Sequence, residues 1–368
     1  MLVRADLDVP LSAAFRLTTD SSVRRLCPTL RRLVARGCKV VIAAHAEDSL
    51  SLAASAEMLG VLLEQPVLQL GRDFATKVGR LAEGQLAILP NLDEFPEERA
   101  NDAAWAGSMA RSFDVYVAEG SNAALQLRAS TVALPRRFPT RGVGQALGND
   151  LDMTRDFVAL PAAPYVAVVG GNNLLHKAEF LRGLLARVDA LLLGGVIGNT
   201  FLAASGRQLG ASKIEADAID TARELLALAG QRGTPLYLPL DGVFRTKSSV
   251  RGPFIPCTLD AWSVEALVDI GPQTRAAYAE ILRQANTLLW NGALGEVDAA
   301  VPAVEGTQTV LRAAANVTYR GVVGVGSTRL ASLLGEGSLF HWKSGGGEGS
   351  RAILVGAVPP GLQSLQRS

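Results

Sequence analysis

A strand-like run of residues ends in two glycines and leads into a helical pattern that carries a lysine. Residues 165–169 (YVAVV) predict a buried strand, and Gly170 and Gly171 supply a turn that residues without a Cβ form cheaply. Asn173 and Lys177 lie at the start of the helical pattern that follows. A strand that passes through glycines into a helix can present backbone N–H groups to an anion such as a phosphate. The same turn also serves close packing alone, and both interpretations stay open.

Histidines and cysteines show no arrangement typical of a metal centre or a catalytic triad. His45, His176 and His341 have no metal-ligand spacing, so we expect no metal site. The three cysteines Cys27, Cys38 and Cys257 also lack such spacing. Because their number is odd, we interpret them as free thiols in a reducing cytoplasm.

Length and composition predict a globular chain with two domains. With 368 residues and about 150 residues per domain, two domains are expected, and 48% hydrophobic residues are enough for large cores. The net charge of +1 does not favour a nucleic-acid partner or an anionic membrane surface. We find no signal peptide and no apolar run of membrane-spanning length, and therefore expect a cytoplasmic protein.

Strand-like and helical segments alternate along the chain, which predicts parallel sheets with helices on both faces. The alternation loosens between residues 133 and 164, where prolines and glycines accumulate, and we place a hinge there. We thus expect an α/β protein of two doubly wound, Rossmann-like domains at 1–155 and 156–354. Residues 355–368 are expected to pack back on the first domain. Ligands in such sheets bind in the loops that follow the strands.

Read in order, these loops resemble those of phosphoglycerate kinases over nearly the whole chain. RADLDVP is similar to that family's R-x-D-F-N-x-P opening, and NLDEFPEE to its N-L-R-F-H-x-E-E segment. GGNNLLHK corresponds to G-G-A-K-V-x-D-K, and LWNGALG to W-N-G-P-x-G. VGVGST resembles the G-G-G-D-[ST] turn, and KSGGGEGS the S-T-G-G-G-A-S turn.

The resemblance implies a hinged kinase that moves a phosphoryl group between ATP and the carboxylate of 3-phosphoglycerate. It implies an acidic substrate on a basic patch of the first domain and Mg-ATP or Mg-ADP on the second. Catalysis of this kind consists of positioning and charge neutralisation. We expect a small-molecule ligand in the interdomain cleft, no nucleic acid and no membrane. The family suggests a monomer, and a protein partner stays open.

The chain departs from the family at the positions that should carry charge. Ser22, Asp48, Asp93 and Gln126 stand where the family has substrate-binding arginines, although Arg128 lies two residues beyond Gln126. One lost charge-assisted hydrogen bond costs about 1.5–3 kcal/mol, so four losses leave little affinity for a phosphorylated acid. Carboxylates would also repel that substrate; those in question are Asp6, Asp8, Asp48 and Asp93, of which Asp8 replaces an asparagine.

The second half shows the same loss. Asn173 replaces the lysine that stabilises the transferring phosphoryl group in the family, whereas Lys177 is retained. Ser327 replaces the aspartate on the nucleotide side, and Asp298 is a candidate for an acidic residue beyond the W-N-G-P-x-G segment. The glycine run 345–347 can still form an anion nest or serve packing alone.

We predict a phosphoglycerate kinase-like protein that has lost the kinase reaction and serves as a pseudoenzyme or ligand-binding protein. The alternatives are an enzyme repurposed for a cationic or uncharged substrate, and an active kinase that uses Arg24, Arg25 and Arg128 instead. The candidate residues fall into three groups: for catalysis Lys177 and Asn173; for the substrate cleft Asp6, Asp8, Ser22, His45, Asp48, Asp93, Gln126 and Arg128; and for nucleotide or phosphate Gly170, Gly171, Asn291, Asp298, Gly326, Ser327, Thr328, Gly345, Gly346 and Gly347.

Overall fold

Two compact units make up the chain. A computed structural model describes residues 1–9, 11, 12, 17, 20–46, 48–159, 161–245, 255–258, 266–297, 303–344 and 347–366. Unit 1 contains Met1–Asp152, Gly345–Ile353 and Ala357–Ser368, and unit 2 contains Met153–Ser344 and Leu354–Gly356.

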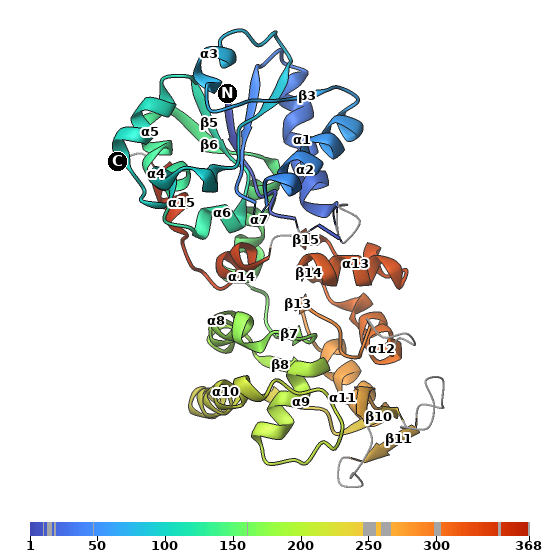
Figure 1. Ribbon diagram of the computed structural model, residues 1–368. Coiled ribbons are helices and arrows are strands. Elements are labelled where there is room, and N and C mark those ends of the chain that lie inside the picture. The colour runs from blue at the N-terminus through green and yellow to red at the C-terminus, as the bar shows by residue number, and fades with distance from the viewer. Residues whose placement is uncertain are drawn as a thin grey trace. The chain divides into compact units, whose positions relative to one another are not determined.

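A six-stranded sheet forms the centre of unit 1, and every neighbouring pair of its strands is parallel (Figure 1). The strand order is β3-β4-β2-β1-β5-β6. Strands β1, β2 and β4 are buried along their whole length, as in a sheet covered on both faces. The strands are β1 Leu2–Arg4, β2 Val40–Ala43, β3 Val67–Gln69, β4 Leu86–Ile88, β5 Val115–Ala118 and β6 Thr140–Val143.

Successive residues of these strands enter two different hydrophobic clusters. Leu2 and Val41 pack with Met109, whereas Val3 and Ile42 pack with Leu26. Because side chains alternate between the faces of a strand, helices cover both faces of this sheet. The helices are α1 Ser21–Val34, α2 Ser49–Leu63, α3 Phe74–Val78, α4 Pro96–Arg99, α5 Ala103–Ala110, α6 Ser121–Leu125, α7 Gln145–Thr154, α14 Glu348–Leu354 and α15 Pro360–Leu365, with shorter turns η1 Leu92–Glu94, η2 Ala129–Ala133 and η3 Pro135–Arg137. The turn η4 Arg155–Ala159 follows α7 and belongs to unit 2.

Unit 2 has a parallel six-stranded sheet of its own, in the order β15-β14-β13-β7-β8-β9. The predicted buried strand 165–169 is its β7, and all five residues are buried. Val166 and Val168 face one hydrophobic cluster, and Ala167 and Val169 face the other. The strands are β7 Tyr165–Val169, β8 Ala190–Leu193, β9 Leu236–Tyr237, β13 Thr287–Asn291, β14 Tyr319–Val323 and β15 Trp342–Ser344.

The helices of unit 2 alternate with its parallel strands, as the sequence predicts. Helix α9 begins at Gly195, two residues after β8 ends at Leu193. Glycines count against a helix in a sequence pattern, but here Gly195 takes φ +61° and begins it. The helices are α8 Leu174–Leu185, α9 Gly195–Ala204, α10 Ile219–Arg232, α11 Pro272–Arg283, α12 Glu305–Ala313 and α13 Val325–Leu333, with turns η5 Ala216–Ala218, η6 Ala314–Asn316 and η7 Gly337–Leu339.

A second, antiparallel sheet in unit 2 was not predicted. Its strand order is β11-β10-β12, formed by Ile255–Thr258, Asp241–Arg245 and Ala266–Ile270. The register between β10 and β12 shifts between Val243 and Phe244, which interrupts the simple alternation that marks a strand in a sequence. Across the described ranges, no helix is both long enough and apolar enough to span a membrane.

Candidate functional site

His45 follows β2 in unit 1 and lies in a buried polar network. Its Nδ1 is 2.5 Å from an Arg4 guanidinium nitrogen, and its Nε2 is 2.9 Å from Glu98 Oε1. Ser130 Oγ donates a hydrogen bond of 2.6 Å to the same Glu98 oxygen. Burial, together with the Arg4 charge, lowers the pKa of His45 against the opposing effect of Glu98. His45 is therefore a neutral ring held between two charged partners inside unit 1.

Asp93, in η1, forms an ion pair with Arg128. Arg128 is the residue that the sequence suggested as a substitute for the arginine that the family has at Gln126. Arg128 donates a 2.6 Å hydrogen bond to Asp93 Oδ1, and Arg99 Nε lies 3.2 Å from the same oxygen. Burial raises the pKa of Asp93, but the hydrogen bond and charge of Arg128 outweigh it, and the pKa is lowered overall. The charge of Arg128 is thus neutralised within unit 1.

The other predicted residues of the first unit have mixed surroundings. Asp48 caps α2 by accepting the Leu50 N–H at 2.9 Å. Asp6 accepts N–H bonds of 2.9 and 2.8 Å from Asn122 and Ala123 at the start of α6. Helix N-termini favour such carboxylates, so both acids stabilise local structure. Ser22 is half-buried near Asp6, whereas Asp8 and Gln126 are exposed.

In unit 2, the Gly170–Gly171 turn packs directly on the loop after β13. Gly170 N–H donates to Asn291 O at 2.8 Å, and Gly171 N–H donates to Ala293 O at 2.6 Å. A Cβ on Gly170 would lie 2.0 Å from Ala293 O, a distance that atoms do not approach. Close packing therefore accounts for Gly170.

A carboxylate already occupies the backbone donors at the start of α8. Glu215 accepts the N–H groups of Asn173 and Leu174 at 2.5 and 2.6 Å. Asn173 has a left-handed backbone with φ 64°. Lys177 Nζ donates to Gly170 O at 2.8 Å. An anion at this turn would have to share it with the Glu215 carboxylate.

The loops after β13 and β14 are tied together by the predicted polar residues. Asn291 Nδ2 donates to Val323 O at 2.7 Å, and Gly292 N–H donates to Ser327 Oγ at 2.8 Å. Thr328 Oγ1 donates to Gly324 O at 3.2 Å within the first turn of α13, which also contains Gly326. Three predicted residues, Asp298, Gly345 and Gly346, lie outside the described residues, and Gly347 directly precedes α14 of unit 1.

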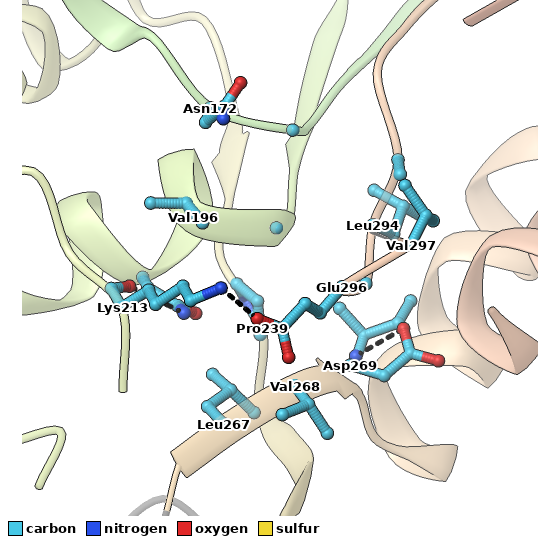
Figure 2. Close-up of a pocket in the computed structure, with 16 residues that line it drawn as sticks. Asn172, Val196, Lys213, Pro239, Leu267, Val268, Asp269, Leu294, Glu296 and Val297 are labelled. Carbon is cyan, nitrogen blue, oxygen red and sulfur yellow. Dashed lines mark hydrogen bonds and ion pairs between the residues drawn. The ribbon is translucent and has the colours of Figure 1, made fainter. Parts of the chain in front are cut away.

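A pocket of about 140 Å³ opens beside these loops within unit 2 (Figure 2). Lys213 and Glu296 face one another across it and form an ion pair. Arg245 binds the second oxygen of Glu296 at 2.9 Å. Burial raises the pKa of Glu296, but these two cations lower it overall, so the carboxylate is charged. The apolar lining consists of Val196, Pro239, Leu267, Val268, Ile270, Ala293, Leu294 and Val297.

A second acid, Asp269 at the end of β12, lines the same pocket. It is 3% exposed and accepts N–H bonds of 2.7 Å from Gly306 and 2.9 Å from Ile270. Burial raises its pKa to about 7, although the hydrogen bonds and the Arg275 charge act against burial. No group of three or more His, Cys, Asp or Glu in the described part of the chain could hold a metal ion.

Sequence reasoning missed Lys213, Asp269 and Glu296. Asp269 belongs to the unpredicted antiparallel sheet, and Lys213 comes from the connection between α9 and η5. Glu296 could have been found, because it directly follows the LWNGALG segment that was singled out.

Comparisons with known proteins agree with this architecture. A sequence model of the family described as phosphoglycerate kinase matches residues 1–357. The phosphoglycerate kinase of Parafrankia sp. is 38% identical, covering 99% of this chain and 96% of the relative, and that of Desulfosudis oleivorans is 32% identical, covering 100% and 96%. The structure of phosphoglycerate kinase from Coxiella burnetii has a TM-score of 0.83 at 28% identity, covering 99% of this chain and 95% of the other. The enzyme from Pyrococcus horikoshii, with a TM-score of 0.84 at 24% identity and the same coverage, supports the fold. The predicted α/β fold with parallel sheets is confirmed.

Proposed function

The chain belongs to the phosphoglycerate kinase family, and we propose that it has lost phosphoryl transfer between ATP and 3-phosphoglycerate and acts as a ligand-binding protein. The observation that best supports this proposal is the ion pair between Asp93 and Arg128 in unit 1, in which a guanidinium nitrogen lies 2.6 Å from Asp93 Oδ1. The family resemblance places a substrate-binding arginine at Asp93. An acid there, which also neutralises the nearby Arg128, is the opposite of what a trianionic substrate requires.

The remaining cations of unit 1 do not restore the basic patch. Arg25 is engaged by Asp150 at 2.9 Å, and Arg24 pairs with Asp20 on the surface. His45 is enclosed between Arg4 and Glu98 and its pKa is lowered, so it brings no positive charge at neutral pH. These pairings count against an active kinase with a shifted arginine set.

The described residues also lack the charged groups that the phosphates and the metal ion of a magnesium nucleotide require. Asn173 is uncharged, and its backbone N–H is bound by Glu215. Ser327, at the position of the nucleotide-side aspartate, is 6% exposed and accepts the Gly292 N–H, so it offers no carboxylate to a metal ion. The described residues therefore support no catalytic step through Mg-ATP.

The pocket of unit 2 is the proposed ligand site. Its apolar wall suits a planar or aliphatic group, and the Lys213–Glu296 ion pair supplies polar atoms for hydrogen bonds to the ligand. We propose that the pocket binds the base and sugar of a nucleoside or nucleotide, without productive contact to any phosphate of the ligand. Calorimetry with adenosine, Mg-ADP and Mg-ATP tests this, with Val196→Trp as the variant that fills the pocket. Similar affinities for all three, lost in Val196→Trp, would support the proposal.

The loss of the kinase reaction is tested in a coupled assay with ATP and 3-phosphoglycerate. We expect no turnover above that of a preparation carrying Lys177→Ala. Turnover that depends on Lys177 would contradict the proposal.

A second candidate, an enzyme with a different substrate, is favoured by Asp269. A buried carboxyl group with a pKa of about 7 in a pocket is suited to general acid–base chemistry. A thermal-shift screen of uncharged and cationic metabolites, followed by product analysis, tests it. Product formation that is lost in Asp269→Asn would favour this candidate over a binding protein.

A further inference from the structure

The ion pair between Lys213 and Glu296 joins two chain segments on opposite sides of the unit 2 pocket (Figure 2). Lys213 lies in the connection between α9 and η5, and Glu296 lies in the loop after β13. The Lys213 side chain is 71% exposed, whereas that of Glu296 is 16% exposed. The pair therefore lies at the mouth of the pocket, between the apolar wall and solvent.

Glu296 is the fixed partner of this pair. Arg245, at the end of β10, binds the second carboxylate oxygen of Glu296 at 2.9 Å. The backbone is held as well, because Glu296 N–H donates to Val268 O at 2.7 Å and Ala303 N–H donates to Glu296 O at 2.8 Å. If Lys213 leaves, Arg245 still neutralises the carboxylate, so no half-buried charge is left without a partner.

Lys213 is the movable partner, and the movement is confined to its side chain. Its backbone carbonyl accepts a hydrogen bond of 3.1 Å from Asn199 Nδ2. The neighbouring Ser212 is held too, because its Oγ accepts the Leu267 N–H at 2.9 Å. The flexible four-carbon stem of a lysine can nevertheless rotate into solvent while the backbone stays in place. Opening of the pair thus requires no rearrangement of the loop.

The strength of such a pair suits reversible closure. Ion pairs with a solvent-exposed partner shift an equilibrium by at most about fivefold. Exposed side chains change rotamer within nanoseconds, so the pair opens and closes quickly. A ligand that binds only the open form has its apparent affinity reduced by the fraction of molecules that are open.

We propose that the Lys213–Glu296 ion pair is a latch that closes the unit 2 pocket in the absence of a ligand. A ligand enters when the Lys213 side chain swings into solvent, while Arg245 keeps Glu296 neutralised. After opening, both side chains of the latch can hydrogen-bond to the ligand. The latch rests on the proposed function, because it regulates the same pocket. It predicts that an uncharged ligand binds more tightly when salt weakens the ion pair.

Calorimetry of the full chain with adenosine at low and high sodium chloride tests the latch. Because adenosine carries no charge, its affinity should rise about two- to fivefold between about 0.02 and 0.5 M salt. Lys213→Met removes the charge and should show no such rise. Lys77→Met breaks an exposed ion pair with Asp73 in unit 1 and should respond like the wild type. No rise in the wild type, or an equal rise in Lys213→Met, would overturn the latch.

A measurement without a ligand separates the latch from the proposed ligand class. Val196→Cys places a thiol on the pocket wall, and iodoacetamide, a small uncharged reagent, measures access to it. At about pH 9.5 the thiol is ionised whether or not Lys213 is present. After correction for the native cysteines, addition of Lys213→Met should accelerate alkylation about two- to fivefold.

The two measurements fail in different ways. Equal alkylation rates with and without Lys213→Met would overturn the latch. If adenosine binds neither the wild type nor Lys213→Met while the alkylation rates differ, the proposed nucleoside ligand is wrong and the latch stands.

Discussion

Arg128 donates a 2.6 Å hydrogen bond to the carboxylate of Asp93, although 35 residues separate them in the chain. Both side chains are about a quarter exposed, at 26% and 24%. Pairs at this depth are partly screened by solvent, so the coupling energy should be about 0.5–1 kcal/mol. We expect a double-mutant cycle of Asp93→Ala and Arg128→Ala in urea to return this value. A coupling energy of zero would show that the two charges act independently.

Replacement of His45 should destabilise unit 1 strongly. His45→Ala leaves the buried Arg4 and Glu98 without a hydrogen-bond partner that each has now, at a cost of about 2–4 kcal/mol. Urea unfolding measures it, with the exposed His176→Ala as a control that should change stability by less than about 0.5 kcal/mol. A similar small effect in both variants would contradict the buried network.

The same histidine predicts a loss of stability in mild acid. Its pKa is lowered in the folded state, so below the ordinary value of 6.5 the unfolded chain binds a proton that the folded chain does not. Stability should therefore fall as the pH drops through about 6.5. Comparison of unfolding midpoints at pH 7.5 and 5.5 checks this, and in His45→Ala the fall should be smaller.

Glu119 has the opposite linkage. Its folded-state pKa of about 7 lies above the ordinary value of 4.5, so between these values the folded chain holds the extra proton. Its contribution to stability is present below about pH 4.5 and is lost as the pH rises to about 7, by an amount on the order of a few kcal/mol. In sodium buffers, Glu119→Gln should have a flatter stability profile over this range than Glu83→Gln. Identical profiles would exclude a raised pKa.

Two glycines of unit 2 should respond oppositely to alanine. In Gly170→Ala the new Cβ meets Ala293 O, and we expect a loss of more than about 2 kcal/mol. Gly230 lies in α10 with nothing within 4 Å of a Cβ, so Gly230→Ala should stabilise by about 0.4–1 kcal/mol. Thermal unfolding distinguishes the two, and a tolerated Gly170→Ala would argue against the packing explanation.

Periodicity predicted the elements well where the pattern is local. The apolar run 165–169 and the helical spacing over Leu174–Leu185 reflect burial of consecutive turns or strand residues, which a sequence shows directly. The antiparallel strands β10 and β12 were not predicted, because a register shift interrupts the alternation of their side chains between the two faces. The likeness of ordered loop motifs, by contrast, was enough for the α/β fold.

The candidate site could be predicted only in part, because the fold brings together hydrogen-bond partners that lie far apart in the sequence. Glu215 reaches the start of α8 from 41 residues away, and Glu98 meets His45 from 53 residues away. Neither spacing has a periodic signature. Sequence comparison could show that Asp93 replaces an arginine, but only the fold shows that Arg128 neutralises it.

The chain returns to unit 1 twice, with Gly345–Ile353 and finally with Ala357–Ser368, which follows the last residues of unit 2. Leu362 and Leu365 of α15 pack on the hydrophobic cluster beneath the first sheet, and Ser364 Oγ donates to Thr131 O at 2.8 Å. During synthesis on the ribosome, unit 1 therefore lacks α15 until all of unit 2 has been synthesised. The first unit to be made is the last to be completed, and a chain cut after residue 356 should fail to close its N-terminal core.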